Sequence, residues 1–220
     1  MLLKIFEVFG RPDFPEKLRE HVVLSLVALL VAIAIALPVA LLIRNTRLGA
    51  AIAINIGNVG RAVPSLAILA LALPLLGIGF ASALVALTAL AIPPILINAS
   101  TGLREVNKDV IDAARGMGLS GSQILARIQL PIAAPVIFAG IRTSAVQTVA
   151  SATLATFIGG GGLGDYIVEG YQRNSTAIAL AGAVSVAVLA FITEAGFWGL
   201  ERTFTPKGLR IAQKRGRARK

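Results

Sequence analysis

The chain has 220 residues, of which 56% are hydrophobic and only 15% are charged. Soluble domains carry about a quarter charged residues, so this composition excludes an ordinary soluble globule. The chain has no cysteine and one histidine, which excludes disulfides, thiolate metal sites and an imidazole cluster. Lys and Arg outnumber Asp and Glu by 21 to 11, an unusual excess for so apolar a chain. We therefore expect a membrane protein that carries neither a metal nor a cofactor of its own.

Stretches with few or no charges, long enough to cross a bilayer, recur along the chain. A spanning helix needs about 20 apolar residues. Residues 1–20 mix apolar and charged side chains, and we expect a short interfacial helix outside the membrane. Residues 21–204 are predicted to form an all-α transmembrane domain with five spanning helices, at 22–43, 49–73, 80–102, 132–157 and 175–200. Splitting the second helix at Pro64 would give a sixth crossing, which we rank second.

The basic residues of the loops predict the orientation of these spans. Five spans place fourteen Lys and Arg on one side of the membrane and five on the other. Because the basic side is normally cytoplasmic, we expect the C-terminus in the cytoplasm and the N-terminus outside. The basic tail, residues 205–220, is then expected to contact anionic lipid headgroups. Nucleic-acid binding is disfavoured because aromatic residues are not interleaved with these bases.

The loop of residues 104–131 is the one substantial hydrophilic stretch between spans. Asn107 is predicted to cap a first short helix, which Gly118 ends. Ser120 and Gln123 have the spacing of a capping box, so a second short helix begins there and leads to the fourth span. We call residues 104–131 the elbow, and expect it to be cytoplasmic.

Seven residues of the elbow resemble the EAA motif of binding-protein-dependent ABC importer permeases: Asp112, Ala113, Ala114, Gly118, Ile128, Leu130 and Pro131. Asp stands where that motif usually has Glu. The resemblance implies the type I importer fold, similar to methionine permeases, in a bacterial inner membrane. It also implies that the elbow is a coupling helix docked on a cytoplasmic ATPase subunit. ATP and Mg²⁺ would be bound by that partner, because the chain lacks the GxxxxGK[ST] phosphate loop.

Three further stretches resemble the branch of these permeases that imports glycine betaine, choline or carnitine: residues 60–67, 139–143 and 157–166. The resemblance implies an extracytoplasmic substrate-binding protein and a second permease subunit, which forms a homodimer or a heterodimer. The same architecture carrying methionine or another small solute is the alternative. A secondary transporter or channel subunit that needs no ATPase is a rival from another class.

The glycine run 159–164 formally satisfies GxGxxG. A dinucleotide site would need a preceding strand, but these glycines follow a membrane span. We expect a tight external turn, and the resemblance implies that four residues there face the binding protein: Gly161, Gly162, Gly164 and Asp165. His21, at the mouth of the first span, is interpreted as an interfacial residue.

Polar residues within spans are the remaining candidates, because a charge at the bilayer centre is costly. We expect five of them, together with the helix-breaking Pro64, to line the translocation path or to lock helices together: Arg61, Ser65, Arg142, Gln147 and Glu194. Glu194 is a candidate partner for one of the two arginines. Both roles, path and lock, remain open from the sequence.

Overall fold

The structure is a computed structural model that describes residues 2–44 and 46–204. The side chains of residues 2–5, 47, 50, 61 and 204 lie outside this description, as does the basic tail 205–220. Within the described residues the regular elements are helices alone, which confirms the predicted all-α fold. They are α1 (Leu2–Phe9), α2 (Phe14–Ile43), α3 (Arg47–Ala62), α4 (Ser65–Leu76), α5 (Phe80–Arg104), α6 (Lys108–Gly116), α7 (Gly121–Ile124), η1 (Leu125–Gln129), α8 (Leu130–Ala152), η2 (Thr153–Ile158), α9 (Gly164–Gln172) and α10 (Thr176–Phe204).

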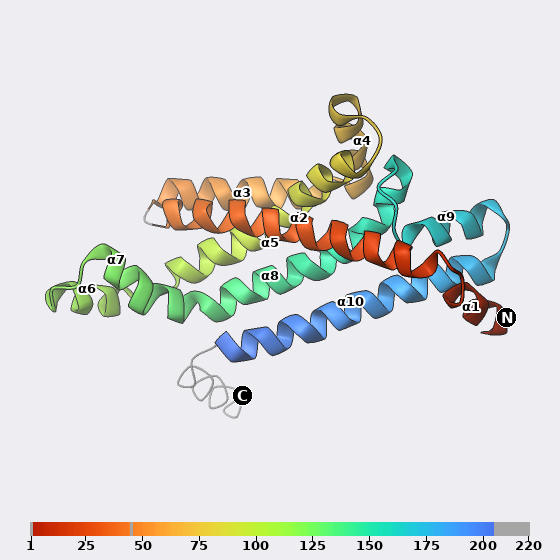
Figure 1. Ribbon diagram of the computed structural model, residues 1–220. Helices are drawn as coiled ribbons and strands as arrows, with labels where there is room; N and C mark the ends of the chain where they lie inside the picture. The colour runs from red at the N-terminus through yellow and green to blue at the C-terminus, as the bar shows by residue number, and fades with distance from the viewer. Residues whose placement is uncertain (1, 45, 205–220) are drawn as a thin grey trace.

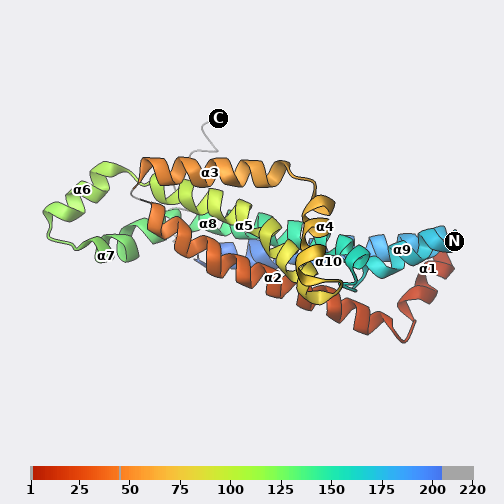
Figure 2. The ribbon, with the colours of Figure 1, turned by 90° about the horizontal axis from the view of Figure 1, so that it is seen from above.

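Four long helices, α2, α5, α8 and α10, run along the length of the molecule (Figures 1 and 2). Each lies in a helical stretch long and apolar enough to cross a membrane. A fifth crossing results if the bent pair α3 and α4 counts as one span. The prediction of about five transmembrane helices is therefore confirmed.

The second predicted span is not one helix. Residues 51–60 and 65–76 meet at an angle of 92°. Val63 has extended backbone angles there, φ −72° and ψ 128°, because a following proline disfavours the helical conformation. Pro64 therefore breaks the span, as the sequence alternative suggested, but α3 and α4 have only 16 and 12 residues and do not make two crossings.

Helix α2 packs through a stripe of small residues. Ala28, Ala32, Ala36 and Ala40 follow one another every four residues, and each is completely buried. Small side chains let membrane helices approach closely. The helix begins at Phe14, earlier than the predicted residue 22, and Leu18 and His21 already pack against the rest of the molecule.

Helices α5 and α8 cross closely through one glycine on each. A Cβ at Gly140 of α8 would lie 2.5 Å from Asn98 Cβ, and a Cβ at Gly102 of α5 would lie 2.9 Å from Val136 Cβ. The Ser144 hydroxyl donates to the Ala91 carbonyl at 2.7 Å across the same contact. Since α5 also contacts α2, α3 and α4, it forms the centre of the bundle.

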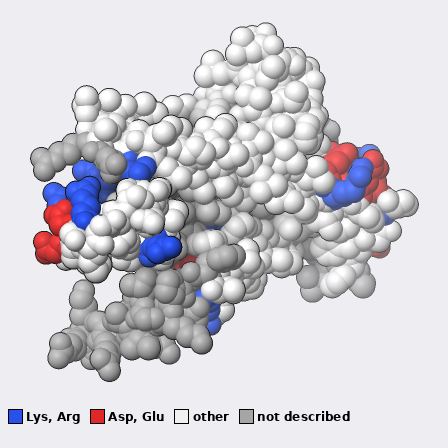
Figure 3. Space-filling view, turned by 60° about the vertical axis from the view of Figure 1, so that its left-hand side comes forward, with Lys and Arg blue, Asp and Glu red and all other residues white. Residues whose placement is uncertain are grey.

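The two ends of the bundle differ in their elements. Helices α6 and α7 project from one end, whereas α1 and α9 lie at the other (Figure 1). On the face drawn in Figure 3, charged side chains gather mainly toward these ends and leave a broad uncharged band between them. This band matches the apolar zone that a bilayer would cover.

Candidate functional site

The first helix of the elbow has both of its predicted ends. The Asn107 side chain accepts a hydrogen bond from the Asp109 backbone N–H at 2.8 Å, so it caps α6 as expected. At the other end Gly118 has a φ of +84°. The Gly118 N–H donates to the Arg115 carbonyl and the Leu119 N–H to the Ala114 carbonyl, a Schellman motif. Glycine is favoured at this turn because the left-handed conformation strains other residues.

The second helix of the elbow is continuous with a membrane span. Ser120 and Gln123 form the predicted capping box at the start of α7. From there the chain stays helical from residue 121 to 158, through a π-helical turn at Leu125–Gln129. Pro131 lies in the first turn of α8, where a missing N–H is tolerated. The second half of the elbow and α8 therefore form one continuous helical stretch.

The residues of the motif divide into a buried set and an exposed set. Ala114 is completely buried, and Ile128, Leu130 and Pro131 are half-buried at the base of the elbow. Asp112, Ala113 and Gly118 are exposed, and Asp112 pairs with Arg115 at 3.3 Å. The apolar side chains of Val110 and Met117 are also exposed, Met117 by 73%. The tip of the elbow therefore presents a small apolar surface at the end of the molecule.

Within the spans the structure joins Arg142 of α8 to two glutamates of α10. Arg142 Nε lies 3.4 Å from Glu194 Oε1, and Arg142 Nη1 lies 3.1 Å from Glu201 Oε2. The glutamates are seven residues apart, two helical turns on one face of α10. One guanidinium thus connects α8 to α10, and Glu201 is a partner that the sequence analysis did not identify.

The other in-span candidates are not brought to this cluster by any contact within the described residues. Gln147 is half-buried on α8. Pro64 and Ser65 lie at the bend between α3 and α4, Pro64 exposed and Ser65 half-buried. The side chain of Arg61, near the end of α3, lies outside the described residues.

At the opposite end, α2 holds the glycine turn through two backbone hydrogen bonds. The Gly162 N–H donates to Glu20 Oε2 at 3.0 Å, and the Leu163 N–H donates to His21 Nδ1 at 3.3 Å. Because His21 Nδ1 accepts, Nε2 carries the proton and donates to the Val149 carbonyl of α8 at 2.9 Å. His21 is completely buried within the chain, and its position at the membrane interface stays a prediction.

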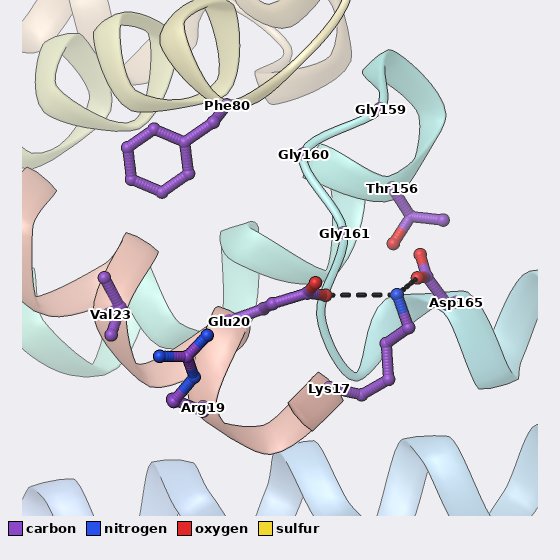
Figure 4. Close-up of a pocket in the computed structure, with 10 residues that line it drawn as sticks. All are labelled: Lys17, Arg19, Glu20, Val23, Phe80, Thr156, Gly159, Gly160, Gly161 and Asp165. Atoms are coloured by element: carbon purple, nitrogen blue, oxygen red, sulfur yellow. Dashed lines mark hydrogen bonds and ion pairs between the residues drawn. The ribbon is translucent and has the colours of Figure 1, made fainter. Parts of the chain in front are cut away.

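Ion pairs reinforce the same junction. Lys17 Nζ lies 2.7 Å from Asp165 Oδ2 and 3.1 Å from Glu20 Oε2 (Figure 4). Glu169 of α9 pairs with Arg11 at 2.9 Å and with Arg173 at 3.3 Å. The hydrogen bond to the Glu169 carboxylate raises the pKa of Arg11, and burial raises the pKa of Tyr166 beside it to about 12. Asp165 and Glu169, the two acidic residues of α9, therefore both form ion pairs with residues of the same chain.

The glycine turn is tight for two reasons. Gly159, Gly161 and Gly162 have φ values between +70° and +99°. A Cβ at Gly164 would lie 2.2 Å from the Thr153 carbonyl oxygen, so only glycine fits there. The turn borders a pocket of about 540 Å³ that is lined by Lys17, Arg19, Glu20, Phe80 and Asp165 among others (Figure 4).

Sequence reasoning missed the partners of the turn, above all Lys17, Glu20 and His21. The only signal was a cluster of charged residues immediately before an uncharged run. Their partners lie more than 120 residues away along the chain. In the described part of the chain, no group of three or more His, Asp or Glu side chains could hold a metal ion.

Comparisons with known proteins agree with this architecture. A family described as "Binding-protein-dependent transport system inner membrane component" matches residues 28–203. The choline transport system permease protein OpuBB of Bacillus subtilis (strain 168) is 42% identical over 193 residues, which cover 88% of this chain and 89% of that protein. The carnitine transport permease protein OpuCB of Listeria monocytogenes is 41% identical over 197 residues, 90% of each chain.

The fold also matches a solved transporter. The methionine ABC transporter MetNI in an inward-facing conformation superposes with a TM-score of 0.76 at 24% identity, over 88% of this chain and 96% of the matched chain. The predicted methionine-permease-like fold is therefore confirmed. Together with the family match, this shows that the chain belongs to the inner membrane components of binding-protein-dependent transport systems, the multi-pass permease subunits of ABC importers.

Proposed function

We propose that the chain is the permease subunit of an ATP-driven importer for quaternary ammonium osmoprotectants such as glycine betaine, choline or carnitine. Relatives that are 41–42% identical over most of both chains are named for choline, glycine betaine and carnitine transport. The chain itself is a transport subunit and not an enzyme. ATP and Mg²⁺ are bound by a separate cytoplasmic ATPase, and an extracytoplasmic protein supplies the solute.

The elbow is the contact with the ATPase. The observation that carries this assignment is its exposed apolar tip, Ala113 and Met117, beside a second short helix that continues into α8 without a break. Exposed apolar patches mark contacts with other proteins or with the membrane, and we assign this one to the ATPase. Asp112, Ala113 and Gly118 meet the partner, whereas Ala114, Ile128, Leu130 and Pro131 fix the elbow to the span.

The opposite end meets the binding protein, with the N-terminus outside. Gly161, Gly162, Gly164 and Asp165 form the turn that faces this partner. A second permease, either a copy of this chain or a similar one, packs against the bundle. Five residues near the bend and on α8 border the path between the two permeases: Arg61, Pro64, Ser65, Arg142 and Gln147. Glu194 pairs with Arg142.

Replacing Ala113 by Trp tests the coupling role. The exposed tip would then no longer fit a partner, so the ATPase should be lost on co-purification and uptake should stop. Ala187→Trp on the exposed face of α10 is the matched control and should keep both. Retained ATP-independent uptake by the Ala113→Trp variant would favour a secondary transporter or channel.

The solute is tested separately. Uptake of radiolabelled glycine betaine, choline, carnitine and methionine should be measured in cells that express the chain with its ATPase and binding protein. We expect competition among the quaternary amines and none by methionine. Methionine uptake without betaine, choline or carnitine uptake would contradict the proposed substrate while leaving the importer assignment intact.

A further inference from the structure

A second pocket, unrelated to the solute path, lies beneath the elbow. It has a volume of about 620 Å³ and is bordered by the ends of α2 and α5, the start of α6 and η1. Three basic side chains line it, Arg44, Arg104 and Lys108, and none of the described lining residues is acidic. On the face drawn in Figure 3, Lys and Arg side chains gather over this end of the molecule.

The three bases are not explained by partners within the described residues. Neither Arg104 nor Lys108 forms an ion pair there, and Arg44 donates Nη1 to the Leu41 carbonyl while its buried Nε has no partner. Arg44 and Arg104 follow or end helices, where a positive charge is favourable. Lys108 is the first residue of α6, where a positive charge is unfavourable, so the helix dipole does not account for it.

A buried amide adds a neutral donor to this set. Gln129 lines the pocket and is only 8% exposed, so its amide N–H groups can donate to an occupant. The buried Nε of Arg44 is the donor without a partner, which is costly, so an occupant that accepts hydrogen bonds is expected. Guanidinium, ammonium and amide groups together are donors suited to a phosphate.

An apolar groove of about 230 Å³ adjoins the basic pocket and shares Leu103 with it. Side chains of α2, α5 and α8 line the groove, among them Leu37, Ala134 and Phe138. The apolar part of α2 ends at Ile43, so Arg44 stands at the level where phospholipid headgroups begin. A free anion would occupy the pocket alone, whereas a phospholipid would fill the pocket and the groove.

We propose that this pocket and groove bind one anionic phospholipid, with its phosphate against Arg44, Arg104 and Lys108 and one acyl chain between α2, α5 and α8. The net charge of the lining side chains selects an anionic headgroup such as phosphatidylglycerol over a zwitterionic one. The lipid joins the first span to the base of the elbow, beside the helix pair that carries motion into the bundle.

The experiment measures phosphatidylglycerol retained by the purified transporter complex, using native mass spectrometry after transfer from vesicles that contain equal phosphatidylglycerol and phosphatidylethanolamine. The wild-type complex should retain phosphatidylglycerol preferentially. Arg104→Gln and Lys108→Gln should each lower retention about fivefold, since one basic contact with an anionic membrane lipid is lost. Arg127→Gln is the matched control, because Arg127 is exposed on η1 and does not line the pocket.

Two further measurements distinguish a phospholipid from a free phosphate ion as the occupant of the pocket. Ala134→Trp, which fills the groove, should lower lipid retention without changing the basic residues. Inorganic phosphate should not displace the lipid; if phosphate displaces it and Ala134→Trp has no effect, the site binds a free anion and the lipid assignment is wrong. Equal retention of the two lipids, or wild-type retention by the Arg104→Gln and Lys108→Gln double variant, would overturn the proposal. Loss of the ATPase by that double variant with normal lipid retention would assign the bases to an acidic protein surface instead.

Discussion

His21 shows how one side chain can connect three parts of the chain. It lies in α2, accepts from the glycine turn and donates to α8. Both ring nitrogens are used only in the neutral form with the proton on Nε2. Glu20, the preceding residue, holds the neighbouring N–H of the same turn, so two consecutive side chains fix two consecutive backbone groups.

Replacing His21 by Leu should loosen the glycine turn. The Leu163 N–H would remain buried without an acceptor, which costs about 1–3 kcal/mol. Hydrogen exchange of a peptide that covers residues 159–165 should therefore become faster. Ser25→Ala is the control, because its buried hydroxyl bonds only to a carbonyl of its own helix. Unchanged exchange in the His21→Leu variant would show that the turn is held by the ion pairs of Lys17 instead.

At the scale of helices, the crossing of α5 and α8 depends on the absence of a side chain. Gly140 places the α8 backbone against Asn98 and the Pro94 carbonyl of α5. The bundle is built around α5, so this contact holds the elbow-bearing helix to its centre.

Gly140→Ala should destabilise the bundle. The added Cβ would lie 2.5 Å from Asn98 Cβ and 2.9 Å from the Pro94 carbonyl oxygen, and a backbone atom cannot move aside cheaply. Overpacking of this kind costs about 1–3 kcal/mol. The thermal midpoint of the purified complex, followed by loss of the monodisperse peak, should fall. Gly199→Ala is the control, since a Cβ there meets no atom within 4 Å, and an equal midpoint for both variants would contradict the close crossing.

Arg142 can either line the translocation path or lock α8 to α10, and variants of the contact between these helices distinguish the two roles. Arg142→Gln should destabilise the complex, because Glu194 and Glu201 lose their shared cation. The cost should fall between about 1 kcal/mol for an exposed pair and about 3–5 kcal/mol for a buried one. Thermal stability and uptake should be measured together in this variant. Normal folding with normal uptake would contradict a role in the path.

The triple variant Arg142→Gln, Glu194→Gln and Glu201→Gln then distinguishes lock from path. The triple variant removes the charges of Glu194 and Glu201 that Arg142→Gln leaves unpaired. Folding should therefore recover whether Arg142 locks the helices or lines the path. Uptake also recovers if the cluster only locks the helices. Uptake stays low if Arg142 borders the solute path, which is the role proposed above.

At the scale of the whole molecule, local signals were readable from the sequence and long-range contacts were not. The caps Asn107 and Ser120 act on residues two or three positions away, so their spacing alone predicted the elbow. The bend at Pro64 was harder, because a proline can either begin a helix or break one. The hydrogen bond from the Gly162 N–H to Glu20 joins residues 142 positions apart, and no local pattern in one sequence predicts such a pairing.

The orientation of the molecule can be tested with single cysteines, because the natural chain has none. Tyr171, 85% exposed in the last turn of α9, and Thr203, exposed in the last turn of α10, lie on either side of the α10 span. A membrane-impermeant maleimide should label Tyr171→Cys in intact spheroplasts and Thr203→Cys only after permeabilisation. Labelling of both after permeabilisation is the control for accessibility.

The labelling result tests both the explanation of the excess of basic residues and the docking of the ATPase on the elbow. If fourteen of the 21 bases lie in the cytoplasm, the elbow lies there too, within reach of an ATPase. The reverse labelling pattern would place the elbow outside, where no ATP is available to a docked partner. The basic loops would then need another explanation, and the coupling role of Ala113 would be excluded along with the orientation.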